Sequence, residues 1–319
     1  MDTTFLNETK VKKMANAFLS EYTTFKLGGP CPYLIHCQTP EQMELTIKNL
    51  EVQNIDYIVI GGGSNLLVSD QGVSCVVVRY FSKTPLIERD GNDVIVSGST
   101  LLDELPQFAI SQSLEGINYA SGIPGTVGGA IVGNAGAFGK QIGDVLVSIE
   151  LLSHDGVKRT VGKEALGFSY RHSDLKVRGD IVLSARLRLS PGDSEKLKAE
   201  RDEILKIRHE KHPDLNTYPC AGSFFRNVEP TSKAERRQAA GWFLEQCGAK
   251  DFRVGGAAIF EKHANIIVKT DGCKPQDVYE LSLKMAEAVK EKFGLTLIRE
   301  VRLVGDFKGK PEGIKDIIW

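Results

Sequence analysis

The sequence lacks the usual signs of a zinc-binding, membrane-embedded or nucleic-acid-binding protein. Its six cysteines form no C-x-x-C pair, so no spacing supports a structural zinc site. No segment approaches about 18 consecutive apolar residues, and the N-terminus has no long apolar run, which argues against membrane insertion or a secretory leader. With 40 Lys and Arg against 41 Asp and Glu there is no basic excess, so nucleic-acid binding is not expected. We therefore expect a cytoplasmic protein with reduced cysteines.

What the sequence does contain is typical of a globular protein with more than one domain. Of its 319 residues, 41% are hydrophobic and 25% are charged. Apolar spacing predicts helices over residues 40–55, 101–114, 193–213, 232–248 and 274–294. Apolar runs bounded by turn residues predict strands over residues 56–60, 73–80, 93–100, 145–153, 156–162, 180–190, 253–260, 264–270 and 295–305. This order predicts three α+β segments, at 20–82, 83–205 and 206–305, followed by a tail at 306–319 that is poorly ordered unless it docks.

The first of two glycine clusters follows a predicted strand, in "VIGGGSNLLV". Glycines allow backbone N–H groups to converge on an anion such as pyrophosphate, and Ser64 and Asn65 add donors. The cluster is not a P-loop, because no Gly-Lys-Ser/Thr follows it, and it is not a Rossmann fingerprint, because Leu66 replaces the third glycine. A tight structural turn is the alternative interpretation.

The second cluster, "SGIPGTVGGAIVGNAGAFG", spans residues 121–139 and contains seven glycines. It is too long for a hairpin turn, and its small side chains suit a loop that lies against a large or extended ligand. The alternative is a glycine-rich crossover packed in the interior. Two such loops in adjacent α+β units favour one long dinucleotide that spans both.

Three other positions carry candidate chemistry. Ser223, in "YPCAGSFFRN", has no His or Asp close in sequence, so it is either a turn hydroxyl or a group that reacts without a conventional base. Arg171 beside Tyr170 is either a surface pair or an anion-binding arginine. Strand alternation places Glu300 and Arg302 on one face, so Glu300 either pairs with that arginine or acts as a catalytic acid.

Taken together, these motifs resemble the UDP-N-acetylenolpyruvoylglucosamine reductase (MurB) family of bacterial peptidoglycan synthesis. The resemblance covers about residues 20–305 and rests on the ordered set "YTTFKLGGP", "GGGSNLL", "SGIPGTVGGAIVGNAGAFG", "YRHS", "AGSFFRN", "EKHANIIV" and "EVRLVG". It implies an α+β fold in which two FAD-binding subdomains of the vanillyl-alcohol oxidase type precede a substrate-binding domain. It also implies the reaction: NADPH reduces FAD, and UDP-N-acetylglucosamine enolpyruvate is then reduced to UDP-N-acetylmuramate.

The resemblance implies roles for individual residues. Ser223 resembles the proton donor, Arg171 the arginine that holds the substrate carboxylate, and Glu300 a further catalytic group. The cofactor-binding residues would be Gly61, Gly62, Gly63, Ser64, Asn65, Leu66, Ser121, Gly122, Ile123, Pro124, Gly128, Gly129, Asn134 and Gly136. The substrate-binding residues would be Tyr170, Lys211, Asn227 and Arg302. No histidine is placed for a covalent flavin link, so noncovalent FAD is expected.

Two alternatives stay open at this point. An FAD-dependent oxidase of the same fold would share the glycine loops, but it has no reason to keep "AGSFFRN" together with "EVRLVG". A regulator that has lost catalysis should have lost at least one of Arg171, Ser223 and Glu300, and all three are present. The chain resembles the shorter subclass of the family, without the insert that carries a substrate-capping tyrosine.

Overall fold

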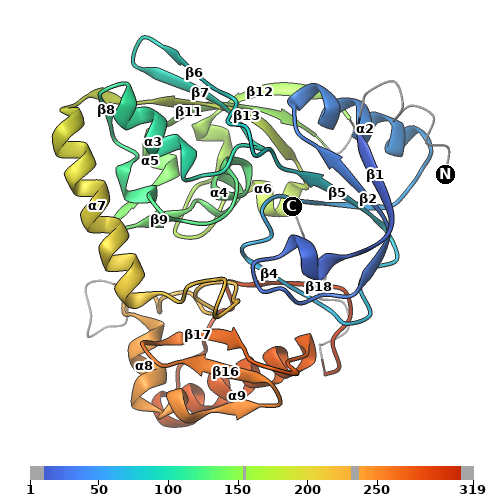
Figure 1. Ribbon diagram of the computed structural model, residues 1–319, viewed down its shortest axis with the longest axis vertical. Helices are drawn as coiled ribbons and strands as arrows, with labels where there is room; N and C mark the ends of the chain where they lie inside the picture. Colours follow the sequence, from blue (N-terminus) through green and yellow to red (C-terminus); the bar gives the residue numbers. More distant parts are fainter. Residues whose placement is uncertain (1–10, 154–155, 231–236, 310–319) are drawn as a thin grey trace.

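The computed structural model describes residues 11–153, 156–230 and 237–309 (Figure 1). Two sheet-containing parts lie above a third part that is built around two helices and a small sheet. The first part comprises β1 (Lys12–Phe18), η1 (Leu19–Tyr22), β2 (Pro30–Cys37), α2 (Pro40–Val52), β3 (Tyr57–Ile60), β4 (Leu66–Val68) and β5 (Val76–Tyr80).

The first sheet has the strand order β1-β2-β5-β3, with β2, β5 and β3 parallel and β1 antiparallel at the edge. The sheet begins with β1, upstream of residue 20, where the sequence predicts the first segment to start. The prediction misses β1 because this strand carries no clear apolar alternation. Helix α2 forms as predicted: Thr39 Oγ1 accepts a bond from Gln42 N, Pro40 occupies the first turn, and Met43 and Leu50 are fully buried.

The second part surrounds a five-stranded antiparallel sheet of order β12-β11-β13-β7-β6. Its strands are β6 (Ile87–Asp90), β7 (Asp93–Ser97), β8 (Leu114–Glu115), β9 (Gly136–Ala137), β10 (Lys140–Gln141), β11 (Leu146–Leu152), β12 (Lys158–Gly162), β13 (Ile181–Arg188) and β14 (Ser190–Pro191). Its helices are α3 (Glu104–Ser111), η2 (Asn118–Ala120), α4 (Val127–Gly133), α5 (Ile142–Val145), η3 (Lys163–Leu166), α6 (Leu175–Arg178) and α7 (Ser194–Lys211).

The glycine-rich segment 121–139 is not the continuous loop that the sequence predicts. Its middle forms α4, which Thr126 caps through a bond from Gly129 N to its hydroxyl. Val127 and Ile131 on this helix are fully buried. Gly128 allows the close packing, since a Cβ there would lie 3.0 Å from the Gly98 carbonyl oxygen. Residues 127–133 therefore fit the alternative of a glycine-rich crossover packed in the interior. Residues 121–126, which precede this helix, form a loop.

The third part packs α8 (Ala240–Gln246), η4 (Ala249–Asp251) and α9 (Pro275–Phe293) against the sheet β15-β16-β17. These strands are β15 (Arg253–Val254), β16 (Ala257–Phe260) and β17 (His263–Lys269). The strand predicted over 295–305 is much shorter, as β18 (Arg302–Val304), and it pairs in parallel with β4 of the first part. The helix predicted over 232–248 is wrong for residues 237–239, where Gln238 forms an isolated bridge with Val228, and the helix begins only with α8; residues 231–236 lie outside the described ranges.

The C-terminal tail is described as far as residue 309. Phe307 is 7% exposed, and its ring centroid lies 5.3 Å from that of Tyr279 on α9. The tail therefore docks by this phenylalanine, whereas the predicted docking by its terminal aromatic residue falls outside the described residues.

Candidate active site

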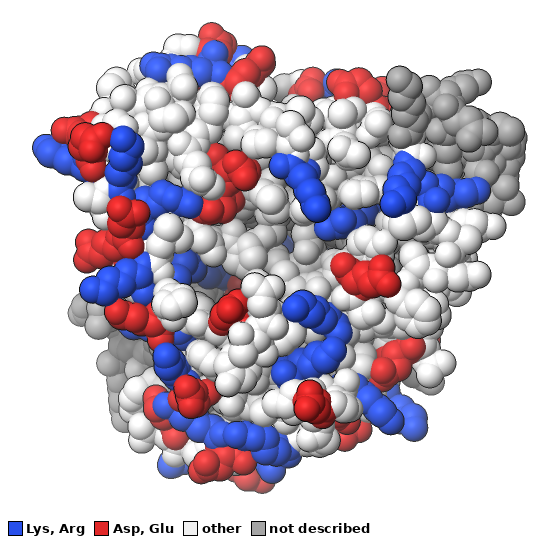
Figure 2. Space-filling model, in the orientation of Figure 1, with Lys and Arg blue, Asp and Glu red and all other residues white. Residues whose placement is uncertain are grey.

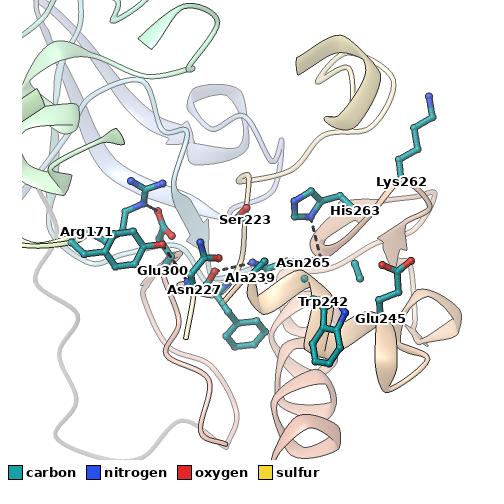
Figure 3. Close-up of a pocket in the computed structure, with 14 residues that line it drawn as sticks. Arg171, Ser223, Asn227, Ala239, Trp242, Glu245, Lys262, His263, Asn265 and Glu300 are labelled. Carbon is teal, nitrogen blue, oxygen red and sulfur yellow. Dashed lines mark hydrogen bonds and ion pairs between the residues drawn. The ribbon is translucent and has the colours of Figure 1, made fainter. Parts of the chain in front are cut away.

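A cavity of about 410 Å³ opens between the second part and the C-terminal residues from 223 onward (Figure 3). Its lining comes from the 170–171 turn, from segments 223–227 and 239–245, from residues 262–265 and from Glu300. The lining residues are Tyr170, Arg171, Ser223, Phe225, Asn227, Ala239, Gly241, Trp242, Glu245, Lys262, His263, Ala264, Asn265 and Glu300. The three predicted catalytic residues, far apart in sequence, thus line one pocket.

Ser223 belongs to a segment whose alternate residues face the pocket. Ser223, Phe225 and Asn227 line it, whereas Phe224 between them is 1% exposed and packs in the core. This two-residue alternation is that of an extended strand, although the segment makes only isolated bridges, to Ile266 and Arg299.

Asn265 holds this segment in place. Its Oδ1 accepts a bond from Phe225 N (3.0 Å), and its Nδ2 donates to Phe225 O (2.8 Å). The Asn265 backbone carbonyl accepts from Phe224 N at 2.8 Å. Asn265 is 2% exposed, so these bonds are shielded from water and fix the backbone that directly follows Ser223.

Arg171 and Glu300 form an ion pair at the edge of the pocket, with 2.8 Å between Nε and Oε1 (Figure 3). Glu300 thus pairs with a second of the three predicted catalytic residues. The Glu300 backbone is fixed as well, since its N–H donates to Phe224 O (2.8 Å) and its carbonyl accepts from Asn65 Nδ2 (3.1 Å). Asn65 thereby connects the first glycine loop to Glu300.

The predicted substrate-binding residues divide into two groups. Tyr170 and Asn227 line the pocket and are bonded to each other, from Asn227 N to Tyr170 OH at 3.3 Å. Lys211 is exposed at the end of α7, and Arg302 lies in β18; neither lines the pocket.

The two glycine loops lie against each other, as one long ligand requires. A Cβ on Gly62 would lie 3.0 Å from Gly125 Cα, and one on Gly61 would lie 2.4 Å from Thr126 Oγ1. Ser64 Oγ donates to Pro124 O at 3.1 Å. At Gly61 and Gly62 a side chain would prevent the two loops from approaching this closely. These glycines are therefore required for the contact between the loops, which we call the junction.

Unsatisfied polar groups at this junction fit a bound dinucleotide. Within the described ranges, the N–H groups of Gly62, Gly63 and Ser64 have no acceptor. The hydroxyls of Ser121 and Tyr119 are buried without a hydrogen-bond partner in the same part of the structure. Buried polar groups rarely stay unpaired, and successive free amides suit a pyrophosphate.

Other predicted cofactor residues have structural roles in this fold. Asn134, which is 1% exposed, bonds to Ser169 O, Gln141 Oε1 and Gly143 N and ends α4 in the left-handed conformation. A Cβ on Gly136 would lie 2.4 Å from Lys140 O in the β9–β10 hairpin. Leu66 is buried in β4. The junction with the first glycine loop involves residues 124–126. Next to this segment lie Gly122 and Ile123, which precede it, and Gly129, which follows it in α4.

Sequence reasoning missed the lining residues Trp242, Glu245 and Lys262. Trp242 is 52% exposed, although an aromatic residue in an apolar helix predicts burial. Lys262 stands beside His263 in "EKHAN", where a charged pair is typical of a surface loop. No local pattern marks these residues, because α8 and β17 come together only in the folded domain.

A histidine pair lies at one end of the pocket. The ring centroids of His212, just after α7, and His263, in β17, are 5.7 Å apart. Burial lowers the pKa of His212 to about 4, helped by the charges of His263, Arg208 and Lys211. Burial also lowers the pKa of His263. Both imidazoles are therefore neutral at pH 7.

The surface around the site is not uniformly charged. On the face in Figure 2, acidic and basic side chains are both spread over the surface, and a group of basic side chains lies to the right of the centre. In the described part of the chain, no helix combines the length and apolar character needed to cross a bilayer.

Comparisons with known proteins agree with the geometry. Residues 31–162 match the family model described as FAD binding domain, and residues 213–304 match the one described as UDP-N-acetylenolpyruvoylglucosamine reductase, C-terminal domain. The chain is 37% identical to a UDP-N-acetylenolpyruvoylglucosamine reductase of Alkaliphilus metalliredigens, over 90% of this chain and 92% of that protein. It is 38% identical to the protein of the same name in Clostridium beijerinckii, over 91% and 92%.

A solved structure gives the same result. The crystal structure of the UDP-N-acetylenolpyruvylglucosamine reductase (MurB) from Thermus caldophilus superposes with a TM-score of 0.74 at 32% identity, covering 92% of this chain and 99% of that one. The fold is the predicted α+β arrangement of an FAD-binding unit with a C-terminal domain. This chain belongs to the UDP-N-acetylenolpyruvoylglucosamine reductase (MurB) family.

Proposed function

We propose that this chain reduces the enolpyruvyl group of UDP-N-acetylglucosamine enolpyruvate, giving UDP-N-acetylmuramate for peptidoglycan synthesis. The names of its relatives support this substrate. The observation that carries the proposal is the convergence of Ser223, Arg171 and Glu300 on one pocket, with Asn65 joining Glu300 to the first glycine loop. We place the reaction in the bacterial cytoplasm, with NADPH as the hydride donor and FAD bound noncovalently.

The glycine-loop junction would hold the FAD pyrophosphate through the free amides of Gly62, Gly63 and Ser64, with the hydroxyl of Ser121 as a further donor. When bound, FAD supplies the hydride that reaches the terminal CH2 carbon of the enolpyruvyl group. All other steps belong to the side chains around the pocket.

Arg171 stabilises the charge that this hydride creates. Adding a hydride to the CH2 carbon moves the electron pair of the C=C bond toward the carboxylate, which becomes enolate-like. The Nε of Arg171 lies 2.8 Å from Glu300 Oε1, and the two outer guanidinium nitrogens are the ones that would bind the substrate carboxylate. A cation fixed in advance stabilises the developing charge without reorganisation. Glu300 keeps the guanidinium in this orientation and polarises the carboxylate through it.

Ser223 completes the reaction by donating its proton to the carbon next to the carboxylate. The segment that carries it is fixed by Asn265, so the hydroxyl faces the pocket from a defined side. A serine hydroxyl is a weak acid, and Arg171, a cation that lines the same pocket, stabilises the alkoxide left behind. Solvent then returns the proton to Ser223.

The test is an anaerobic visible spectrum of the purified protein. We expect a flavin spectrum that bleaches with one equivalent of NADPH and returns when UDP-N-acetylglucosamine enolpyruvate is added. Flavin that bleaches but is not restored by this substrate would contradict the proposed reaction. A protein that cannot be reconstituted with FAD would contradict the cofactor as well.

A further inference from the structure

Lys176 is a buried cation that touches the backbone of Arg171. It lies on the short helix α6 and is 9% exposed. Its Nζ donates a hydrogen bond of 2.6 Å to the Arg171 carbonyl oxygen. A buried ammonium is costly unless it is compensated, so this contact requires a reason.

The backbone that Lys176 holds is in an unfavourable conformation. Arg171 has φ of +55°, in the left-handed region where glycine or asparagine is usual. It is the third residue of a tight turn, in which Ser169 and His172 exchange two backbone bonds of 3.1 Å. A residue with this conformation persists only when its surroundings fix it.

Three bonds fix this turn from outside. Asn134 Nδ2 donates to Ser169 O at 2.8 Å, and Ser173 Oγ donates to Val132 O at 2.7 Å. These two anchor the ends of the turn to α4. The bond from Lys176 reaches the backbone of the strained residue itself.

The charges around Lys176 make the bond sensitive to protonation. Arg302, Arg226 and Arg171 repel its ammonium, and Glu300 is the acidic group that attracts it. Burial is the main cause that lowers the pKa of Lys176, to about 7, and the arginines lower it further. An arriving carboxylate favours the charged form, and a charged donor makes the stronger hydrogen bond to a carbonyl.

We propose that Lys176 is a positioning residue: its ammonium clamps the Arg171 carbonyl and so keeps the strained turn in the conformation that directs the guanidinium toward Glu300 and the substrate carboxylate. This inference rests on the proposed reduction of an enolpyruvyl carboxylate for its kinetic consequence. The clamp itself is a structural statement that can be tested separately.

The kinetic test compares Lys176→Met with the wild-type holoenzyme. Methionine keeps the length of the side chain but removes the donor and the charge. We expect kcat/KM for the enolpyruvyl substrate to fall roughly 10- to 100-fold, because a displaced guanidinium no longer meets the carboxylate. Lys163→Met, at an exposed lysine, is the control and should stay within about threefold of wild type.

A double-mutant cycle identifies the route of the effect. If Lys176 acts through Arg171, adding Lys176→Met to Arg171→Ala should lower the rate of flavin reoxidation no further. Additive losses would overturn the inference, as would a Lys176→Met enzyme within threefold of wild type.

The pH dependence of the wild-type enzyme gives a further test. Its kcat/KM should fall as the pH rises through about 7, because Lys176 loses its proton there. This fall in kcat/KM should be absent in Lys176→Met.

Hydrogen exchange separates the clamp from the proposed reaction. In Lys176→Met, exchange at the amides of Ser169 and His172 should be about tenfold faster, because the turn opens more often. If wild type does not oxidise its flavin with the substrate, the proposed function fails, and this measurement alone decides the clamp. If Lys176→Met does not retain FAD, Lys176→Gln takes its place. Unchanged exchange would overturn the clamp.

Discussion

At the residue scale, Asn265 explains how the irregular segment that carries Ser223 is held in place. The segment lacks the continuous ladder of a sheet, yet one buried amide satisfies both polar backbone groups of Phe225. An Asn side chain offers an acceptor and two donors and so imitates a neighbouring strand. Ser223 is therefore positioned by packing and hydrogen bonds and needs no partner base.

The first prediction concerns Ser223 itself. Ser223→Ala should still bind FAD and be reduced by NADPH, whereas reoxidation by the enolpyruvyl substrate should slow by roughly 10²- to 10⁴-fold, the usual contribution of a general acid. Ser223→Cys should lose less, because a thiol is a stronger acid than a hydroxyl. Stopped-flow absorbance would separate the two half-reactions.

Ser111→Ala, at the exposed end of α3, is the matched control and should reoxidise normally. If Ser223→Ala reoxidises at the wild-type rate, the proton comes from another group. The pocket would then offer Lys262 as the next donor to test.

At the element scale, the glycine loop after β3 is shaped by its neighbours. Gly63 has φ of +65°, and a Cβ there would lie 2.1 Å from the Tyr22 carbonyl oxygen. Gly91, in the turn between β6 and β7, has nearly the same φ of +63° but nothing within 4 Å of its Cβ position. The two glycines share one backbone conformation and differ in the space around them.

This pair gives a controlled prediction. Gly91→Ala should lower the free energy of unfolding by about 1 kcal/mol, the cost of the left-handed conformation, and leave FAD affinity unchanged. Gly63→Ala should cost roughly 2–4 kcal/mol, because a steric clash is added, and should weaken FAD binding at least about tenfold. Urea unfolding of the apoprotein and FAD titration by fluorescence measure the two effects. Equal costs at both sites would mean that the loop adapts and the clash is relieved.

The same elements show what the sequence can and cannot predict. The long helices α2, α7 and α9 follow from apolar spacing and, at α2, from the Thr39 cap, which are local signals. Helix α4 escapes prediction because Val-Gly-Gly-Ala-Ile-Val-Gly has low helix propensity, and burial against β7 and β13 stabilises it instead. The position of Arg171 beside Glu300 is likewise a tertiary fact. The motif order indicates both residues, but no spacing indicates their contact.

At the scale of the whole molecule, the chain returns at its end to the part where it began. Strand β18 pairs with β4, and Leu303 and Leu67 bury together in the core of the third part. Arg302 N donates to Asn65 O, next to the bond from Asn65 Nδ2 to Glu300 O. The glycine loop and Glu300 are thus neighbours by sheet pairing. The predicted boundaries at residues 82, 205 and 305 describe the order of segments but not this return.

The contact between His212 and His263 makes the junction of α7 with the third part sensitive to acid. Both pKa values are lowered, so the folded protein favours neutral imidazoles, whereas the unfolded chain titrates near 6.5. Their stabilising contribution is fully present above about pH 6.5 and is lost as the pH falls toward 4. Stability should therefore decline over this interval, with each histidine adding a slope of at most about 1.4 kcal/mol per pH unit.

His212→Gln should flatten this decline in stability, whatever loss of packing it causes at pH 7. His209→Gln, at an exposed position on α7, is the control and should leave the decline unchanged. Urea unfolding from pH 7 to pH 4 measures the slope directly, and an unchanged slope in His212→Gln would mean that His212 is as easily protonated in the folded protein as in the unfolded chain.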